Sequence, residues 1–415
     1  MERRNLKRVL IHSIVFSPDG VSTAYLYNDI ALGLVENGFD VIVLTTTPHY
    51  NVIESALTKQ QLIKKLFGLY FVSYYHGIKV YHLPLKKYKK VIFRLFSFVY
   101  WHFLSLIFGL TIKNISFVIS PSPPLSIGFI SLLIAKFKAA KSVYNVQEIY
   151  PDLLINQGNI KSSVLIGLLK RFEKFIYNNS TAVITIDEIF YSKIKSRFIN
   201  PNKLNIISNF VDTDLYKPIK AKLELPLIFD QSNDKIKLIY AGNIGFFQDW
   251  DPFLYAAKEL KGENIEFLII GEGVQKRFLE DSVKEQGLIN VKIYPYQHRD
   301  FMPAINNLAD IHFIVINKQI EQEGFPSKVY TIMACAKPMI VVTSVKTPLF
   351  NFLSERGCAE LITENRSQGF VNSIIKLAND KSLRLNMGNN GYKHIQASYS
   401  KEIVISKYVN LLNSI

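Results

Sequence analysis

The feature that most constrains the fold is a repeated alternation of short apolar runs with longer segments of helical period. The runs are rich in Val and Ile and have strand length, as in parallel sheets covered on both faces. A helix is predicted from about Thr23 to Glu36, after the first run. This rhythm is typical of doubly wound α/β folds. The predicted strands are Val9–Val15, Val41–Thr45, Phe117–Ser120, Ser142–Val146, Ala182–Ile186, Lys237–Tyr240, Phe267–Ile270, Val291–Tyr294, His312–Ile316 and Met339–Val342.

The length of 415 residues and the number of predicted strands favour two sheets over one. We expect a first doubly wound domain at residues 1–205 and a second at residues 206–395. A C-terminal helix at about 396–415 is expected to pack back on the first domain.

Positive charge is concentrated in the first half of the chain. Residues 1–200 contain 24 Lys or Arg and 11 Asp or Glu, whereas residues 201–415 contain 25 and 23. Between Ser55 and Gln147 there are thirteen basic residues and no carboxylate. Such a field attracts phosphates, whether on lipids, on nucleic acid or in a diphosphate ligand. No nucleic-acid-binding module or regular basic–aromatic strand pattern accompanies it, so we expect no nucleic-acid partner.

Cysteine content and the N-terminal segment indicate the compartment. Cys335 and Cys358 provide neither a disulfide framework nor a metal-binding spacing, which suits a reducing environment. The apolar run after the basic residues 1–8 stops at Pro18, too early for the core of a signal peptide. We therefore expect a cytoplasmic protein.

Residues 91–112 form a long apolar segment, without a charged residue from Leu95 to Ile112. A spanning helix needs about 20 apolar residues, so this segment is at the threshold. It could be a buried helix, a membrane span, or a helix lying in the membrane interface. We favour partial burial with one face touching lipid, because aromatic and basic residues suited to the interface lie in and before the segment. The expected membrane-side residues are Trp101, Lys86, Lys87, Lys89, Lys90 and Arg94.

Two glycine turns precede predicted helices. The first, residues 16–20, follows the first strand and ends at Gly20. The second, residues 323–328, contains Gly324 and ends at Lys328. Backbone N–H groups at a helix start, together with an ammonium, would stabilise a diphosphate leaving group, and a carboxylate at Glu323 could bind sugar hydroxyls. Ordinary strand–helix turns remain the alternative for both.

Two Asp-x-Asp triplets, Asp212 to Asp214 and Asp249 to Asp251, could in principle hold a divalent metal. The second lies at a predicted helix start, where Asp is a common cap. No His or Cys cluster suggests zinc. We expect no metal site and no cofactor.

Several segments, in this order, resemble the family-4 retaining glycosyltransferases over essentially the whole chain. They are Pro18–Gly20, Asn37–Thr45, Ser122–Leu125, Gln147–Asp152, Ser208–Asp214, Tyr240–Gly245 and Glu323–Pro338. The resemblance implies two Rossmann-like domains facing each other across a cleft, the GT-B type. It is closest to O-antigen and capsule enzymes of the L-fucosamine transferase type.

The resemblance also implies an activity and a set of site residues. The reaction would be metal-independent, retaining transfer of a sugar from a nucleotide-sugar, UDP-linked, to a lipid-diphosphate-linked saccharide at the inner face of the cytoplasmic membrane. The implied catalytic residues are Glu323, Lys328 and Glu148, and Asp152 lies on the acceptor side. The implied donor-binding residues are Gly20, Gly242, Asn243, Gly271, Gly324, Phe325, Pro326, Ser327 and Thr331.

The sequence departs from the family's pattern at three positions. An Arg and a Lys usually follow the strand that ends near Gly242 and bind the donor diphosphate; here the positions are Asn243 and Gln248. The family's second motif glutamate, which holds the ribose, falls at Thr331. Lys328 could take over the diphosphate. Two other functions stay open: a nucleotide-sugar epimerase of the same fold, and a non-catalytic peripheral membrane protein.

Overall fold

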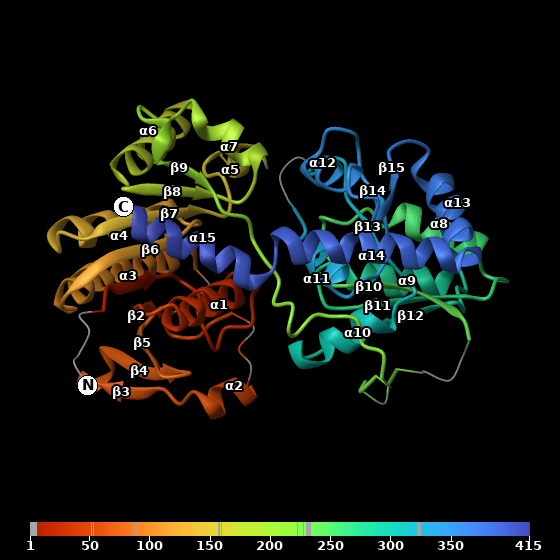
Figure 1. Cartoon of the computed structure of the whole chain (residues 1–415), viewed down its shortest axis with the longest axis horizontal. Helices are drawn as coiled ribbons and strands as arrows, with labels where there is room; N and C mark the ends of the chain where they lie inside the picture. The colour runs from red at the N-terminus through yellow and green to blue at the C-terminus, as the bar shows by residue number, and fades with distance from the viewer. Residues whose placement is uncertain are drawn as a thin grey trace. The chain divides into compact units, whose positions relative to one another are not determined.

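The computed structural model contains two compact units, residues 1–209 with 402–415 and residues 210–401. It describes residues 6–415 except 51, 53, 87, 89, 157, 159, 222, 227, 230–233 and 322–324, and also leaves out the side chains of 54–56 and 91. Each unit has a mainly parallel sheet, so the predicted doubly wound α/β class is confirmed (Figure 1).

The sheet of unit 1 has the strand order β3-β4-β5-β2-β1-β6-β7-β8-β9. All its neighbouring strands pair in parallel except β3–β4 and β4–β5. Strand β2 lies on one side of β1, with β5, β4 and β3 beyond it, and β6 to β9 lie on the other side, so the strand order reverses between β1 and β6. The strands are β1 (Arg8–His12), β2 (Asp40–Thr46), β3 (Ile63–Lys65), β4 (Tyr70–Tyr75), β5 (Ile78–Leu83), β6 (Ile115–Pro121), β7 (Lys141–Val146), β8 (Ala182–Thr185) and β9 (Leu204–Ile206).

Helices α3, α4 and α6 form one layer on the sheet of unit 1, with α4 between the other two (Figure 1). Because parallel crossovers are right-handed, α1, which connects strands in the opposite direction, covers the other face. The helical elements are α1 (Ser22–Glu36), α2 (Glu54–Lys59), η1 (Leu66–Gly68), α3 (Val91–Thr111), α4 (Leu125–Phe137), α5 (Asp152–Asn156), α6 (Ser163–Asn179), α7 (Glu188–Lys195), η2 (Pro201–Lys203) and α15 (Lys401–Ser414).

The C-terminal helix α15 completes unit 1. It passes so close to α1 that a Cβ atom added at Gly33 would lie 2.7 Å from the Ile405 side chain. The amide of Asn145, at the end of β7, donates a hydrogen bond of 2.7 Å to the buried hydroxyl of Tyr408. The last helix is therefore bonded to the centre of a sheet whose strands all precede residue 207.

The apolar segment at residues 91–112 is helix α3. Its Ile92–Thr111 portion is long and apolar enough to cross a membrane by length and composition, and 22% of its most apolar window is buried. Residues 92–96 are exposed in succession, whereas further along the exposed positions recur at helical spacing. The first turns of α3 thus project from the unit, and the rest is packed along one side.

The expectation for Trp101 is wrong. Its ring is fully buried and stacks on His12, with ring centroids 5.4 Å apart. The helical period places this position on the side of α3 that faces the sheet, opposite Phe103. Trp101 is therefore a packing residue and does not reach a membrane surface.

The sheet of unit 2 has the order β12-β11-β10-β13-β14-β15, the arrangement of the dinucleotide-binding fold, with reversal between β10 and β13. The strands are β10 (Ile236–Ala241), β11 (Ile265–Ile270), β12 (Val291–Tyr294), β13 (Ile311–Val315), β14 (Met339–Val342) and β15 (Ala359–Ile362). The helical elements are α8 (Asp251–Glu259), α9 (Lys276–Glu285), η3 (Arg299–Phe301), α10 (Met302–Leu308), α11 (Lys328–Ala334), α12 (Pro348–Ser354), α13 (Arg366–Asn379) and α14 (Lys381–Ser398).

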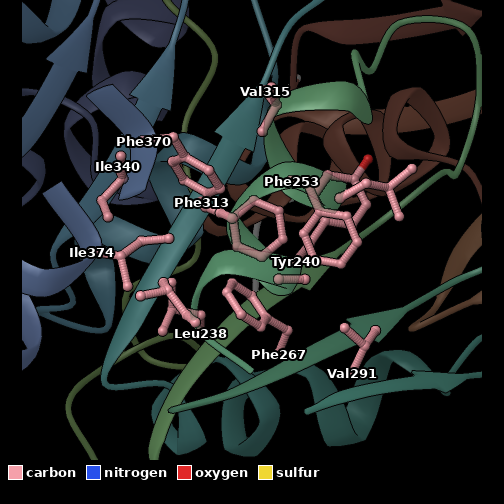
Figure 2. Packing of buried hydrophobic residues seen from close by; sticks show 14 of the residues in the cluster. Leu238, Tyr240, Phe253, Phe267, Val291, Phe313, Val315, Ile340, Phe370 and Ile374 are labelled. Carbon is pink, nitrogen blue, oxygen red and sulfur yellow. The ribbon is translucent and has the colours of Figure 1, made fainter. Parts of the chain in front are cut away.

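Aromatic rings form the centre of the core of unit 2 (Figure 2). The rings of Phe253 and Phe313 stack with centroids 5.6 Å apart, and Phe267 meets Phe253 edge-on. Tyr240, the next-to-last residue of β10, packs against Phe313 in the same cluster. The core thereby fixes a side chain that lies directly below the carboxyl edge of the sheet.

All the predicted strands are present, with ends shifted by up to three residues. The predicted helix at 23–36 is α1. Strands β3, β4, β5, β9 and β15 were not predicted. Strands β4 and β5 form an antiparallel hairpin rich in Tyr, and their alternation of apolar and polar residues lacks the continuous apolar run by which the other strands were identified.

Removal of one buried hydroxyl tests the docking of α15. We expect Tyr408→Phe to lower the free energy of unfolding by about 1–3 kcal/mol, because the Asn145 amide would lose its acceptor in the core. Chemical denaturation measures the change. Tyr255→Phe is the matched control, since the Tyr255 hydroxyl bonds Gln368 on the surface, and an equal effect in both variants would contradict the docking.

Candidate functional site

The loops after β10 and β11 touch through their backbones at the carboxyl edge of unit 2. A Cβ atom at Gly271 would lie 1.9 Å from the carbonyl oxygen of Gly242, and one at Gly273 would lie 2.1 Å from that of Ile244. Hydrogen bonds from Gly242 N to Ile270 O and from Ile244 N to Glu272 O join the two segments. Only glycine fits at Gly271 and Gly273, so the two loops can approach each other this closely.

Lys328 lies under the first of these loops, beside the point where the strand order of unit 2 reverses. Its Nζ is 3.6 Å from the centroid of the Tyr240 ring, and a Cβ atom at Gly242 would approach that Nζ to 2.7 Å. Lys328 is half-buried as a residue, and burial of its ammonium lowers the pKa to about 7. The structure thus brings together two predicted site residues, Lys328 and Gly242, and adds Tyr240, which sequence reasoning missed.

The two positions that depart from the family's diphosphate clamp stabilise the loop itself. The carbonyl oxygen of Asn243 accepts a hydrogen bond of 2.6 Å from the Tyr240 hydroxyl. The side chain of Asn243 packs close to Gly245 and Gly273. Gln248 accepts a hydrogen bond from the Gly245 amide. Lys328 is a basic group that this chain places beside Gly242 in the loop.

The residues before α11 form a small aromatic cluster. The Phe325 ring packs on Tyr330 and Phe352, with centroids 5.3 and 4.9 Å away. Pro326 is half-buried and Ser327 is exposed at the start of the helix. Thr331, one turn into α11, donates a hydrogen bond of 2.9 Å to the Lys328 carbonyl, so its hydroxyl serves the helix.

Glu323 and Gly324 lie outside the described residues, as do Lys87 and Lys89. The predicted roles of these four residues remain predictions. The structure does describe Glu321, which immediately precedes the undescribed part of the donor motif.

Arg366, at the start of α13, contacts residues of three other loops of this edge and was not predicted. Its guanidinium donates to the Glu321 carboxylate at 2.8 Å, to the carbonyl of Ile316 at 2.8 Å and to the Ser344 hydroxyl at 3.1 Å, and it lies 3.8 Å from Asp249. The side chains of Arg366 and Glu321 are both buried. A lone Arg at a helix start carries no sequence signal for such a role, because its partners lie far away along the chain.

In unit 1, the turn that ends at Gly20 is held by the buried side chain of Asp19. The Asp19 carboxylate accepts hydrogen bonds from the backbone amides of His49 and Tyr50, at 2.8 and 2.7 Å. Gly20 N donates to the Tyr50 carbonyl. Burial raises the pKa of Asp19, and the two amide bonds oppose that shift. The predicted glycine turn therefore lies at the carboxyl edge of unit 1, next to the loop after β2.

Glu148 and Asp152 follow β7 at the same edge but have different environments. Burial raises the pKa of Glu148, which also bonds the Tyr150 hydroxyl, and such a carboxyl group is suited to proton transfer. The Asp152 carboxylate pairs with Arg197, which also binds the buried Glu173. Burial raises the pKa of Glu173 to about 7, and Arg197 opposes that shift. Asp152 thus has a charged partner, whereas Glu148 is bonded to the Tyr150 hydroxyl.

The predicted membrane-side cations that the structure describes lie around the start of α3. Lys86, Lys90 and Arg94 are exposed. The Lys86 amide donates to the Ser97 hydroxyl, which fixes the approach to the helix. Two of these cations therefore precede the projecting apolar turns, and Arg94 lies within them.

The Asp-x-Asp triplets take part in local structure. Asp212 accepts from the amides of Asp214 and Leu215 and pairs with Lys401 at 3.2 Å. Asp249 accepts from the amide of Asp251 at 3.3 Å. Among the described residues, no group of three or more His, Cys, Asp or Glu is arranged to hold a metal ion.

Residues 227–394 match the family model described as glycosyl transferases group 1, which covers most of unit 2. WcaI of Escherichia coli K12, named as a colanic acid biosynthesis glycosyl transferase, is 25% identical over 82% of this chain and 84% of its own. The glycosyltransferase WbjE of Pseudomonas aeruginosa is 25% identical over 65% of this chain and 67% of its own. These matches show that the chain is a glycosyltransferase.

Solved structures place the fold in the GT-B class. HepE of Anabaena, solved in complex with UDP, has a TM-score of 0.71 and 13% identity, with 99% of this chain and 100% of that chain covered. Sucrose-phosphate synthase of Thermosynechococcus elongatus has a TM-score of 0.72 and 14% identity, with 98% of each chain covered. The predicted two-domain glycosyltransferase fold is thereby confirmed.

Loss of the guanidinium tests whether Arg366 holds together the loops at the carboxyl edge of unit 2. We expect Arg366→Met to lower the free energy of unfolding by about 3–5 kcal/mol, since the buried Glu321 carboxylate would lose its counter-charge. Denaturation followed by a probe in unit 2 measures this change. In the control Lys376→Met, loss of the exposed pair with Glu360 should cost at most about 1 kcal/mol. A similar small change for Arg366→Met would refute the role.

Proposed function

We propose that this glycosyltransferase transfers a sugar from a UDP-sugar to a lipid-linked saccharide during synthesis of a bacterial surface polysaccharide. The relatives named for colanic acid and capsular polysaccharide biosynthesis support the pathway class. HepE, whose fold is similar, was solved with UDP and with UDP-glucose, which supports the uridine nucleotide. The resemblance to L-fucosamine transferases makes an amino-deoxyhexose the first donor sugar to test.

The observation that carries the proposal is the position of the Lys328 ammonium. It lies under the Gly242 backbone, at the crevice where open α/β sheets bind ligands. Held by Tyr240 and largely desolvated, it is preorganised to stabilise the charge that develops on a departing diphosphate.

We further propose a retaining reaction without a metal. Glu323 orients the donor sugar, Lys328 stabilises the diphosphate, and Glu148 lies on the acceptor side. The bond between the anomeric carbon and the diphosphate oxygen breaks while the acceptor oxygen bonds that carbon from the same face. The leaving phosphate oxygen takes the acceptor's proton, so a side-chain base is not required.

Attachment to the inner face of the cytoplasmic membrane completes the proposal. The exposed apolar face of α3 and the cations Lys86, Lys90 and Arg94 support interfacial binding, since aromatic rings favour the headgroup level and cations favour anionic lipids. The buried Trp101 ring holds α3 on its sheet, which favours lying in the interface over spanning it. A lipid-linked acceptor would then meet the enzyme without leaving the bilayer.

Substitutions at Lys328 test the proposed diphosphate contact. We expect Lys328→Met to lower kcat by about 10²–10³ with an intact fold, as loss of one preorganised charge-stabilising group does elsewhere. The pKa of Lys328 is about 7, so above this pH the free protein has a mostly neutral amine. A UDP-sugar that binds the charged ammonium must then bring a proton with it. Wild-type affinity should therefore fall between pH 6.5 and 8.5, by up to about tenfold per pH unit above the pKa.

Lys328→Arg is the control, because a guanidinium stays charged throughout this range and its binding should not change with pH. Isothermal titration with UDP-glucose, and with the donor that a panel of UDP-sugars identifies, measures both effects. Near-wild-type turnover in Lys328→Met, or a pH-independent affinity in the wild type, would remove Lys328 from the diphosphate site.

The absence of a metal requirement is tested directly. We expect transfer to continue in excess chelator, because the Asp212 and Asp249 carboxylates already bond backbone amides. Product formation is measured with and without chelator after exhaustive dialysis. Complete loss of activity that Mg²⁺ or Mn²⁺ restores would contradict a metal-independent reaction.

A further inference from the structure

Helix α6 begins with a second projecting apolar segment, which the membrane proposal does not use. Residues 163–165, 167 and 168 are all exposed, whereas the end of the helix is buried around Ile176 and Tyr177. The exposed fraction is 73% for Val164 and 57% for Leu168. The exposed apolar side chains Val164, Leu165 and Leu168 lie on one side of the start of the helix, within about 100° of one another, and Ile166 and Leu169 are half-buried. Apolar side chains exposed in this way gain little from packing within unit 1, so they call for another apolar environment.

Topology places this segment beside the start of α3. Helix α3 follows β5 and α6 follows β7, so both helices begin at the carboxyl edge of the same parallel sheet. Both contact α4, which lies between them on one face of the sheet (Figure 1). At helix spacings of 8–10 Å, the two starts are roughly 20 Å apart. Two separate apolar projections thus lie at one edge, near Glu148 and the Gly20 turn.

The charge of this layer determines which partner fits. Helices α3, α4 and α6 contain a single carboxylate, Glu173, which is buried and paired with Arg197. Exposed cations accompany both projections: Lys86, Lys90 and Arg94 near α3, and Lys161, Lys170, Arg171 and Lys174 near or on α6. Two copies of such a face would repel each other, whereas an anionic leaflet provides both the apolar interior and the opposite charge.

We propose that the start of α6, with Val164, Leu165 and Leu168, inserts into an anionic lipid leaflet as a second contact beside α3. This inference rests on the membrane attachment in the proposed function and adds an orientation to it. Contact through one helix would leave the unit free to rotate about that helix. Contact through two points holds the carboxyl edge of unit 1, with Glu148, against the lipid surface.

Vesicle binding by the full chain tests the second contact. The double variant Val164→Ser/Leu168→Ser should bind vesicles of phosphatidylglycerol and phosphatidylcholine about ten- to hundredfold more weakly than the wild type, because two apolar side chains no longer leave water. Phe137→Ser/Ile199→Ser is the matched control. Phe137 is 69% exposed and is the last residue of α4, and Ile199 is 90% exposed and follows α7, so both lie at the amino edge of the sheet and their loss should leave binding unchanged.

The double variant Phe93→Ser/Phe96→Ser distinguishes attachment through α3 from the second contact through α6. If it weakens binding while Val164→Ser/Leu168→Ser does not, α6 is no contact and attachment through α3 stands. If the wild type binds no vesicles, both membrane proposals fail, and binding of UDP-glucose still reports independently on the transferase site. A sedimentation coefficient that falls in Val164→Ser/Leu168→Ser without vesicles would show that a second copy covers α6, which also overturns the inference.

Discussion

Direct backbone contact between two glycine loops is the constraint on which the candidate donor site depends. Because no Cβ atom fits at Gly271 or Gly273, the loop after β10 is pressed against the loop after β11. The Lys328 ammonium lies between the Gly242 backbone of the first loop and the ring of Tyr240. Burial in turn lowers the pKa of Lys328, because it disfavours the charged ammonium until an anion lies beside it. The burial of Lys328, and the chemistry proposed for it, thus depend on the close packing of the two glycine loops.

The sequence allowed the class of fold to be predicted because buried parallel strands are continuous apolar runs, such as Leu268 within β11 or Val341 within β14. Strands at the margins of the sheets lack that signal. Strand β3 has exposed residues only, and β15 is half-buried throughout. Their pairing comes from neighbours far along the chain, which periodicity within a short window does not reveal. The same limit applies to Trp101, since residues of an apolar helix look alike until a sheet covers one side.

The candidate site was predictable where a local motif carries it and not where tertiary contacts make it. Lys328 was recognisable from the turn that it ends, and Gly242 from the segment that resembles the family. Arg366 was not, because its acceptors come from segments 22 to 50 residues away. Tyr240 was predicted as the end of a strand, but its ring contacts Lys328 only because α11 packs against the sheet.

The return of the chain to unit 1 has a consequence for biosynthesis. Helix α15 supplies the Tyr408 hydroxyl to Asn145 and fills the space beside Gly33, yet it is translated after the whole of unit 2. A ribosome adds about 5–20 residues per second, so residues 1–209 wait roughly ten seconds or longer for their final helix. During that interval the α1 side of the nascent unit exposes the apolar surface that α15 later covers. During translation, chaperones are therefore expected to bind mainly the first half of the chain. That dependence should end when α15 has been made and covers the surface beside α1.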